Sequence, residues 1–315
     1  MPFSIAMKTS ERSCCRLKRN KGLVASLCVM VLWGMLFALV KLGFKTFAIK
    51  EIGDILAFAG LRFVVCGAVI TGFVALWQPA QFRGLKKGLW KVLLAGLFSV
   101  VLHYACTYVA QITAEASKTA ILKQLGAIFY ICFAVLFFPE DKLTWSKLAG
   151  LVLGALGILA INMDAGKLTF HLADLLIIGA SFCTVFANVI SKKAFQTVKP
   201  ILLTGVSQLF GGVALMGIGL GAGGKLGNVL PGTGPELGIF GAIVAASVVS
   251  YCIWFITVQK ENLSKLFIIK FSEPLFAAVF GWLLLDENIF QWKYLIAFLL
   301  ICGGVVMANR KARKA

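Results

Sequence analysis

The stretch LFIIKFSEPLFAAVFGWLLL, residues 266–285, decides the fold class of this chain. It is about 20 residues long, the length of helix that crosses roughly 30 Å of hydrocarbon, and most of its side chains are apolar. Lys270, Glu273 and Pro274 interrupt it near the middle. A charged side chain costs about 2.5 to 3.5 kcal/mol in lipid, so Lys270 and Glu273 are expected to face a protein interior or a wet cavity.

The whole chain has the composition of an integral membrane protein. Its 315 residues are 60% hydrophobic and 14% charged, which leaves too little polar surface for a soluble fold of this size. Apolar windows of about 20 residues predict an all-α protein with ten transmembrane helices. The predicted spans are residues 23–44, 54–77, 90–111, 117–138, 145–163, 172–191, 200–221, 236–258, 264–285 and 292–309.

The basic residues predict the orientation in the membrane. With the N-terminus inside, 21 of the 31 Lys and Arg residues fall on the inner side of the predicted spans. The tails 1–22 and 310–315 are then both cytoplasmic and basic. The net charge of +18 faces an anionic lipid leaflet, so it does not indicate a nucleic-acid partner.

An internal repeat divides the chain into two halves, 23–163 and 172–309. At an offset of 147 residues, Lys123 pairs with Lys270, Tyr104 with Tyr251, Glu140 with Glu287, and Asn162 with Asn309. Each half holds five predicted spans, an odd number, so the second half enters the membrane from the opposite side. Inverted repeats of this kind are typical of alternating-access transporters.

The charges inside predicted spans are the candidate substrate-binding residues. They are Arg62, Lys123, Lys270 and Glu273. Lys270 and Glu273 lie three residues apart and can pair on one helix face, which would be a purely structural role. Lys123 has no acid at such spacing, and the repeat brings it toward Lys270. Two lysines at one cavity favour an anionic group on the substrate.

Glu273 is also the candidate for a coupling group, because a buried carboxyl can gain and lose a proton. Pro274 is expected to kink the span and to leave the carbonyl of Lys270 without its helical partner. Proton coupling is the default for a carrier without an ATP-hydrolysing domain, and a packing kink alone is the alternative.

Aromatic side chains are expected to line the same cavity. Tyr104, Tyr108 and Gln111 share one helix face, which could stack on or hydrogen-bond a solute. Tyr251, Trp254 and Phe255 lie on the repeat-related span. Packing between helices is the alternative for each of them. His103 lies beside Tyr104 without a second ligand at useful spacing, so no metal and no cofactor are predicted.

Two other classes of protein remain as alternatives to a transporter. An intramembrane enzyme would need a catalytic pair or a metal cluster at depth, and the chain offers only two histidines and no obvious dyad. A non-transporting scaffold would use the buried charges only as structural pairs.

The chain resembles the EamA-type members of the drug/metabolite transporter superfamily. The resemblance rests on LWGMLFALVK (32–41), LRF (61–63), FFPEDKLTW (137–145) and EPLFAAVFGWLLLDE (273–287), which occur in the family's order. It implies a ten-helix inverted-repeat carrier of small metabolites in the cell membrane, with both termini cytoplasmic.

Several residue roles come from this resemblance. The family's acidic residues at the ends of spans 4 and 9 fall on Glu140 and Glu287, where a structural role is expected, and its Glu-Pro falls on Glu273 and Pro274. Many members have a proline in span 4 where this chain has Gly126–Ala127, so the two halves are expected to kink differently. The phosphate-translocating branch has basic residues at positions similar to Lys123 and Lys270.

Together these observations predict a secondary transporter of a small anionic or zwitterionic metabolite, such as an amino acid, an organic acid or a nucleotide-like compound. The alternative is an exporter of amphipathic drugs or metabolites in which the buried charges are structural. The glycines of spans 5 and 10 indicate either helix packing or a homodimer contact. The predicted site residues are Lys123, Lys270, Arg62, Tyr104, Tyr251, Tyr108, Trp254 and, for ion pairing or coupling, Glu273.

Overall fold

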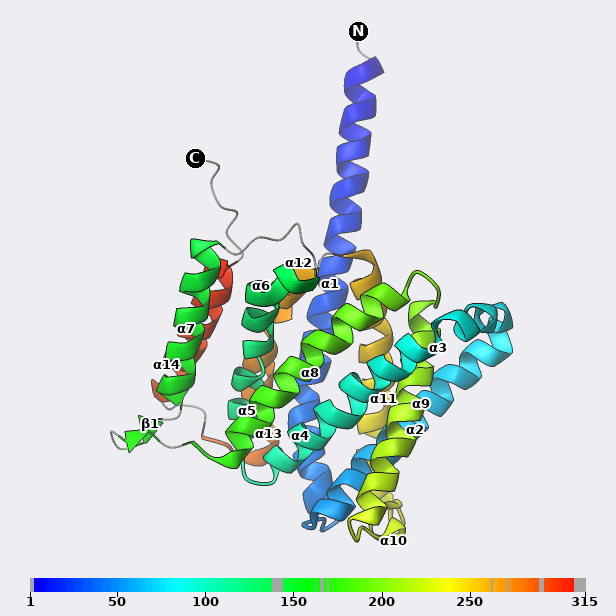
Figure 1. Cartoon of the computed structure of the whole chain (residues 1–315), viewed down its shortest axis with the longest axis vertical. Helices are drawn as coiled ribbons and strands as arrows, with labels where there is room; N and C mark the ends of the chain where they lie inside the picture. The colour runs from blue at the N-terminus through cyan, green and yellow to red at the C-terminus, as the bar shows by residue number, and fades with distance from the viewer. Residues whose placement is uncertain are drawn as a thin grey trace.

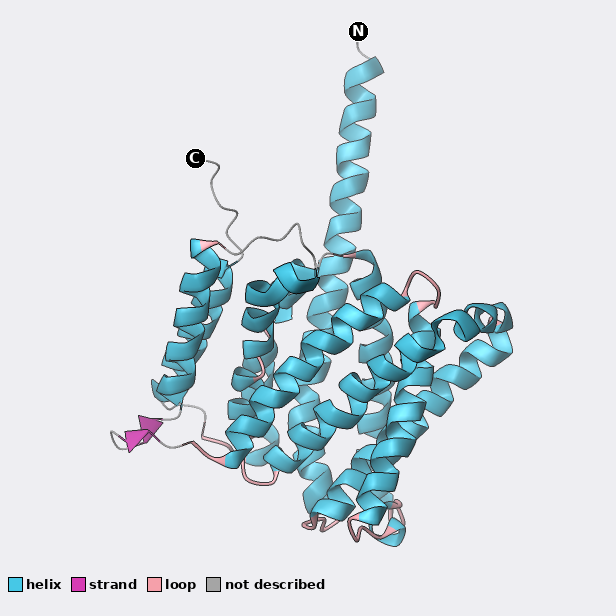
Figure 2. Ribbon diagram, viewed as in Figure 1, coloured by secondary structure: helices cyan, strands magenta, loops and turns pink. Residues whose placement is uncertain are grey.

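The computed structural model describes residues 3–137, 144–161, 163–164, 167–168, 170–261, 263–270, 272–288 and 292–308. They form a bundle of helices, and the first helix extends out of the bundle at its N-terminal end (Figures 1 and 2). A ribbon of two short strands, β1 (Met163–Asp164) and β2 (Lys167–Leu168), is the described departure from an all-α chain.

Helices make up most of the described chain. In chain order they are α1 (Phe3–Thr46), α2 (Ile52–Trp77), η1 (Pro79–Gln81), α3 (Phe82–Gly96), the π-helical η2 (Leu97–Leu102), α4 (His103–Gln111), α5 (Ala116–Leu122), α6 (Leu125–Phe137), α7 (Trp145–Ile161), α8 (Leu172–Ala194), α9 (Pro200–Gly221), α10 (Leu226–Val229), α11 (Gly234–Lys260), α12 (Leu263–Lys270), α13 (Glu273–Leu285) and α14 (Trp292–Ala308).

Six of the described helical segments are long and apolar enough to cross a membrane. They are Val24–Thr46, Ile52–Trp77, Pro79–Gln111, Leu172–Ala194, Pro200–Gly221 and Gly234–Lys260. The other four predicted spans, 117–138, 145–163, 264–285 and 292–309, coincide with shorter or broken helices. The chain is therefore a multi-pass membrane protein, and the count of ten spans stays a prediction.

Two of the predicted spans are broken at related places. α5 ends at Leu122 and α6 begins at Leu125, while α12 ends at Lys270 and α13 begins at Glu273. Tight i to i+3 hydrogen bonds occur at both breaks, from Gln124 N to Ile121 O and from Ser272 N to Ile269 O, each 3.0 Å long. Both halves are therefore interrupted at this point, including the half without the proline, and a difference between the two kinks stays a prediction.

The backbones of helices α2 and α9 are in direct contact at several glycines. An ideal Cβ atom added to Gly60 would overlap the backbone nitrogen of Met216, and one added to Gly212 would overlap that of Val64. Gly67 meets Leu209 in the same way. Small residues let two helices approach closely in a membrane, so these glycines hold α2 and α9 together along most of their lengths.

Helices α7 and α14 form a second pair that lies at one side of the bundle (Figure 1). A Cβ atom on Gly304 would lie 2.7 Å from the carbonyl oxygen of Gly150, and one on Gly157 would lie 2.5 Å from the Ile301 side chain. The prediction that these glycines serve helix packing is confirmed for contacts within the chain. A homodimer stays a prediction.

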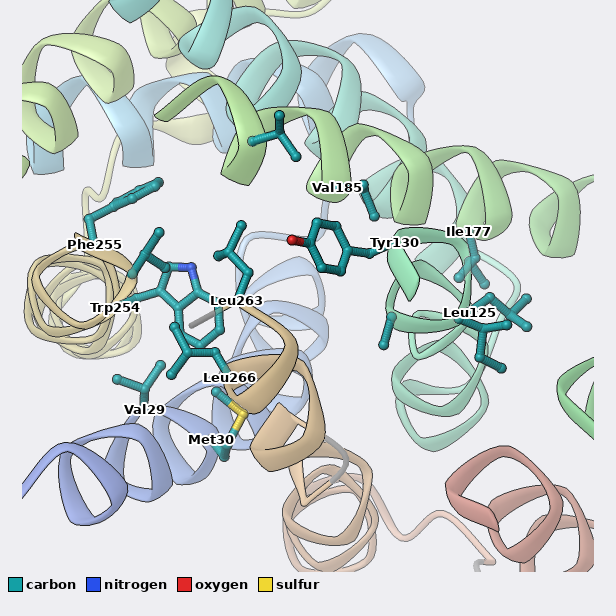
Figure 3. Close-up of a cluster of buried hydrophobic side chains, with 14 of the residues drawn as sticks. Val29, Met30, Leu125, Tyr130, Ile177, Val185, Trp254, Phe255, Leu263 and Leu266 are labelled. Carbon is teal, nitrogen blue, oxygen red and sulfur yellow. The ribbon is translucent and has the colours of Figure 1, made fainter. Parts of the chain in front are cut away.

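The buried apolar side chains join helices that are far apart in the sequence. Figure 3 shows part of one cluster, with Val29 and Met30 of α1, Trp254 and Phe255 of α11, and Leu266 of α12 grouped on one side of it. Lipid would accept these side chains as readily as the core does, so close packing rather than water exclusion holds the helices together. Trp254 and Phe255 of this cluster also line the cavity described next.

Candidate functional site

One cavity is lined by all eight residues predicted from the sequence. They are Arg62, Tyr104, Tyr108, Lys123, Tyr251, Trp254, Lys270 and Glu273. The free volume between the lining side chains is about 70 Å³, which is smaller than that of a typical small-molecule site. Helices α1, α2, α4, α8 and α11 contribute to the wall, together with the breaks that follow α5 and α12.

The two lysines lie at the two helix breaks and are both buried. Lys123 is 8% exposed and Lys270 is 5% exposed. The Nζ atom of Lys123 lies 4.8 Å from the centre of the Phe37 ring, and that of Lys270 lies 5.4 Å from the centre of the Trp33 ring. Trp33 and Phe37 are one turn apart on α1, so both ammonium groups lie against the same face of this helix.

Glu273 begins α13 and is 1% exposed. A carboxylate in the first turn of a helix is stabilised by the helix dipole. Among the described side chains, ion pairs join Lys41 to Glu287 and Lys118 to Asp174. The ion pair predicted between Lys270 and Glu273 is not one of them. The Oε2 atom of Glu273 has no hydrogen-bond partner among the described residues, so it remains available to a bound molecule.

Arg62 is held by neutral groups. Its Nε and Nη2 atoms donate to the hydroxyl oxygen of Ser247 at 2.9 and 2.7 Å, and Nη1 donates to the hydroxyl of Tyr108. The guanidinium also lies 4.7 Å from the centre of the Phe63 ring. The structure thus shows both a packing role for Arg62 on α2 and a place for it in the cavity wall.

Tyrosines from the two halves of the chain meet in this wall. The hydroxyl groups of Tyr104 on α4 and Tyr251 on α11 are hydrogen-bonded to each other. Trp254, one turn along α11 from Tyr251, donates from Nε1 to Oδ1 of Asn188 on α8 at 3.0 Å. These bonds fix the direction of the rings, so the aromatic wall is rigid and has an apolar face toward the cavity.

The structure adds residues that were not predicted from the sequence. His103 is buried in the cavity wall, and its Nε2 atom lies 3.3 Å from the Nζ atom of Lys123. Trp33, Phe37 and Asn188 also line the cavity. Their sequence signals are weak, because a tryptophan and a phenylalanine in an apolar span are ordinary, while the position of Asn188 inside a predicted span is a signal that could have been used.

The site also contains a polar side chain at the end of the face that holds Tyr104 and Tyr108. Gln111 is 2% exposed, lines the cavity, and its Nε2 atom has no hydrogen-bond partner among the described residues. An amide nitrogen donates two hydrogen bonds, so the cavity wall offers a donor at Gln111 and an acceptor at Glu273.

A cluster of polar contacts closes the end of the bundle where α1 and α13 end. Glu287 accepts a hydrogen bond from the backbone nitrogen of Ala116 at 2.8 Å and pairs with Lys41 at 3.4 Å. Lys41 also donates to the carbonyl of Ala114 at 3.0 Å, and Tyr294 donates to Glu115. Glu287 thus joins three segments, as a structural role requires. The matching Glu140 lies outside the described residues.

Comparison with known proteins agrees with this architecture. The model of the EamA-like transporter family matches residues 20–163 and again residues 171–310. A solved crystal structure superimposes with a TM-score of 0.65 at 16% identity and covers 92% of this chain and 96% of that one. The chain belongs to the EamA-like transporter family, and the resemblance seen in the sequence is confirmed.

Relatives with related sequences carry names that point to transport rather than to enzyme activity. An uncharacterized transporter of Archaeoglobus fulgidus is 22% identical over 93% of this chain and all of the relative. An S-adenosylmethionine/S-adenosylhomocysteine transporter of Chlamydia muridarum is 22% identical over 82% of both chains. A probable amino-acid metabolite efflux pump of Escherichia coli is 25% identical over 91% of this chain and 94% of the relative.

Proposed function

We propose that this protein is a secondary transporter that moves a small anionic or zwitterionic metabolite by alternating access. In this proposal the chain spans the cell membrane ten times as two inverted repeats, 23–163 and 172–309, with both termini in the cytoplasm. The two separate matches to the family model and the matching helix breaks support two equivalent halves.

The excess of positive charge in the cavity is the observation from which we infer that the substrate has an anionic group. Arg62, Lys123 and Lys270 line it with a single carboxylate, Glu273, among the described lining residues. Buried charges require partners, and Lys123 and Lys270 form no ion pair among the described side chains. An anionic group of the substrate, placed between the two ammonium groups, would supply the missing charge.

The acceptor on Glu273 favours a zwitterion over a multiply charged anion. The Oε2 atom of Glu273 accepts hydrogen bonds and repels phosphate or a second carboxylate. A substrate ammonium group would satisfy it while the substrate carboxylate binds the lysines. Amino acids and S-adenosylmethionine have both groups, and the aromatic wall formed by Trp33, Tyr251 and Trp254 can hold an apolar or cationic substituent.

Exchange in proteoliposomes tests this proposal. Purified protein is reconstituted with L-methionine inside, and uptake is measured for L-methionine, for 3-(methylthio)propylamine without the carboxylate, and for 2-hydroxy-4-(methylthio)butanoate without the amine. Succinate and glucose 6-phosphate test larger anions. Uptake of the amino acid above both analogues is expected, whereas preferred uptake of glucose 6-phosphate would reject the zwitterion.

The same assay decides the second candidate function. The aromatic side chains of the wall also suit an amphipathic drug, with the buried charges serving only structure. Ethidium export that survives Lys123→Met and Lys270→Met, together with no movement of the charged metabolites, would establish this alternative.

Proton coupling through Glu273 is part of the proposal. A buried carboxylate that binds either a proton or the substrate ammonium links the movements of the two. Glu273→Gln is expected to leave exchange measurable and to abolish uptake driven by a pH gradient. Unchanged pH-driven uptake by this variant would exclude coupling at Glu273.

A further inference from the structure

His103 stands out in the cavity wall because its partner is a lysine and not an acid. It is 5% exposed and begins α4, immediately after the π-helical turn of η2. We propose that His103 is a positioning residue: its Nε2 atom accepts a hydrogen bond from the Lys123 ammonium group and aims the remaining N–H groups of Lys123 into the cavity. This rests on the proposed function of Lys123 as an anion-binding residue.

The contacts of the imidazole determine which nitrogen carries its proton. The Nδ1 atom lies 2.9 Å from the carbonyl oxygen of Ala180 on α8. A carbonyl oxygen only accepts hydrogen bonds, and the Thr184 hydroxyl, 3.0 Å from Nδ1, donates to the same carbonyl at 3.1 Å, so these contacts assign the proton to Nδ1. The Nε2 atom of the neutral ring then has a free lone pair, and an ammonium group only donates. The 3.3 Å contact between Nε2 and Lys123 Nζ is therefore a hydrogen bond from the lysine to the histidine.

Residues of helix α8 contact Lys123 at its backbone carbonyl and, through His103, at its ammonium group. The hydroxyl of Ser181 shares its proton between the carbonyl of Ile177, at 3.0 Å, and the backbone carbonyl of Lys123, at 3.3 Å. The Lys123 carbonyl leaves the regular helical pattern here, because it accepts a hydrogen bond from the backbone nitrogen at i+3. Ala180, the residue before Ser181, fixes His103 and through it the ammonium group. The position of α8 thus sets both the backbone and the side-chain direction of Lys123.

The second lysine is held in a different way, although the two are related by the repeat. At the offset of 147, Ser250 stands where the first half has His103. Ser250 accepts a hydrogen bond from Trp33 Nε1 at 3.1 Å, and Lys270 lies over the Trp33 ring. A ring face has no single acceptor direction, so Lys270 can turn about it. Lys123 is the aligned donor of the pair.

Nitrogen NMR tests the positioning role without any ligand. The chain has two histidines, and His171 is exposed, so a ¹⁵N-histidine sample of the full chain with His171→Gln reports His103 alone. The expected spectrum shows a protonated Nδ1 and a bare, hydrogen-bonded Nε2. Lys123→Met is expected to shift the Nε2 resonance, while the control Thr184→Val, which removes a hydroxyl 3.0 Å from Nδ1, leaves Nε2 in place. A protonated Nε2, or no response to Lys123→Met, would overturn the proposal.

Two variants of His103 distinguish the contribution of Nε2 to transport from that of Nδ1. His103→Gln keeps an amide acceptor near the Nε2 position, whereas His103→Asn keeps an amide donor near Nδ1 and loses the acceptor. Using L-methionine, succinate and glucose 6-phosphate as probes, we expect His103→Asn to raise KM about tenfold or more and His103→Gln to stay within about threefold of the native value. Equal KM values for the two variants would refute positioning. If the native protein moves none of the probes, the proposed function fails and the NMR result still decides the role of His103.

Discussion

The ammonium group of Lys270 lies 5.4 Å from the centre of the Trp33 ring, and it forms no ion pair among the described side chains. Desolvated contacts between a cation and an aromatic ring are worth up to about 2 kcal/mol. The ring thus stabilises the charge of a lysine that lines the cavity.

Replacing Trp33 is expected to weaken substrate binding. Trp33→Leu removes the ring and should raise KM by roughly 2- to 30-fold, which corresponds to about 0.5 to 2 kcal/mol. Trp33→Phe keeps a ring and loses the hydrogen bond to Ser250, so its KM should lie between those of the native protein and Trp33→Leu. The exposed Trp282 supplies the control Trp282→Leu, and initial rates of exchange provide KM. A native KM in Trp33→Leu would contradict the support given to Lys270.

Neutralising the two lysines is expected to abolish transport and to preserve folding. Lys123→Met and Lys270→Met each remove a positive charge from the cavity, and methionine fits the apolar part of the space left. Exchange should fall to the background rate of protein-free liposomes, while the elution volume in detergent is unchanged. Lys45→Met, at an exposed position near the end of α1, is the control. Near-native transport by both cavity variants would remove the lysines from the site.

The contact between α2 and α9 should not tolerate a side chain. Gly60→Ala places a methyl group on the backbone of Met216, and overpacking of this kind costs about 1 to 3 kcal/mol. The matched control is Gly217→Ala on α9, where a Cβ atom meets open space and helix propensity improves. Thermal unfolding in detergent should show a lower Tm for Gly60→Ala and an unchanged or higher Tm for Gly217→Ala. The reverse order would contradict the described packing.

The half-buried Glu115 predicts a pH dependence of stability. Burial and the nearby Glu287 raise the pKa of the Glu115 carboxyl. The folded protein then binds this proton more tightly than the unfolded chain, so the contribution to stability is present below the unfolded pKa and is lost as pH rises through the folded pKa. Glu115→Gln should remove this loss and raise Tm more above the folded pKa than below the unfolded pKa. An equal change in Tm at pH values below the unfolded pKa and above the folded pKa would contradict a raised pKa of Glu115 in the folded protein.

The charged part of the site could be predicted from the sequence because a charge in an apolar span is costly and therefore visible. Lys123, Lys270 and Arg62 stand out on this ground, and Tyr104 and Tyr251 through the repeat. The contact of Lys123 with His103 could not be predicted, because the two residues lie 20 positions apart and only the packing of α4 against the break brings them together.

The backbone holds two features without a clear signal in the sequence. The break between α5 and α6 occurs without a proline, and the hydroxyl of Ser181 on another helix supplies a bond at this point. The glycines between α2 and α9 have a weak signal because glycine is common throughout membrane spans, and only the paired positions Gly60 with Met216 and Gly212 with Val64 distinguish this contact.

The close contact of α2 with α9 limits the motions that can open the cavity. Backbones that touch over several turns cannot slide or separate without leaving voids where no side chain can follow, so α2 and α9 should travel as a single rigid body. Arg62 lies on α2 and donates two hydrogen bonds to Ser247 of α11, so α11 is tied to the same pair of helices. In the proposed alternating-access cycle the hinge is therefore expected outside this pair of helices, and the breaks between α5 and α6 and between α12 and α13 are the candidate positions, next to the charges that the substrate would bind.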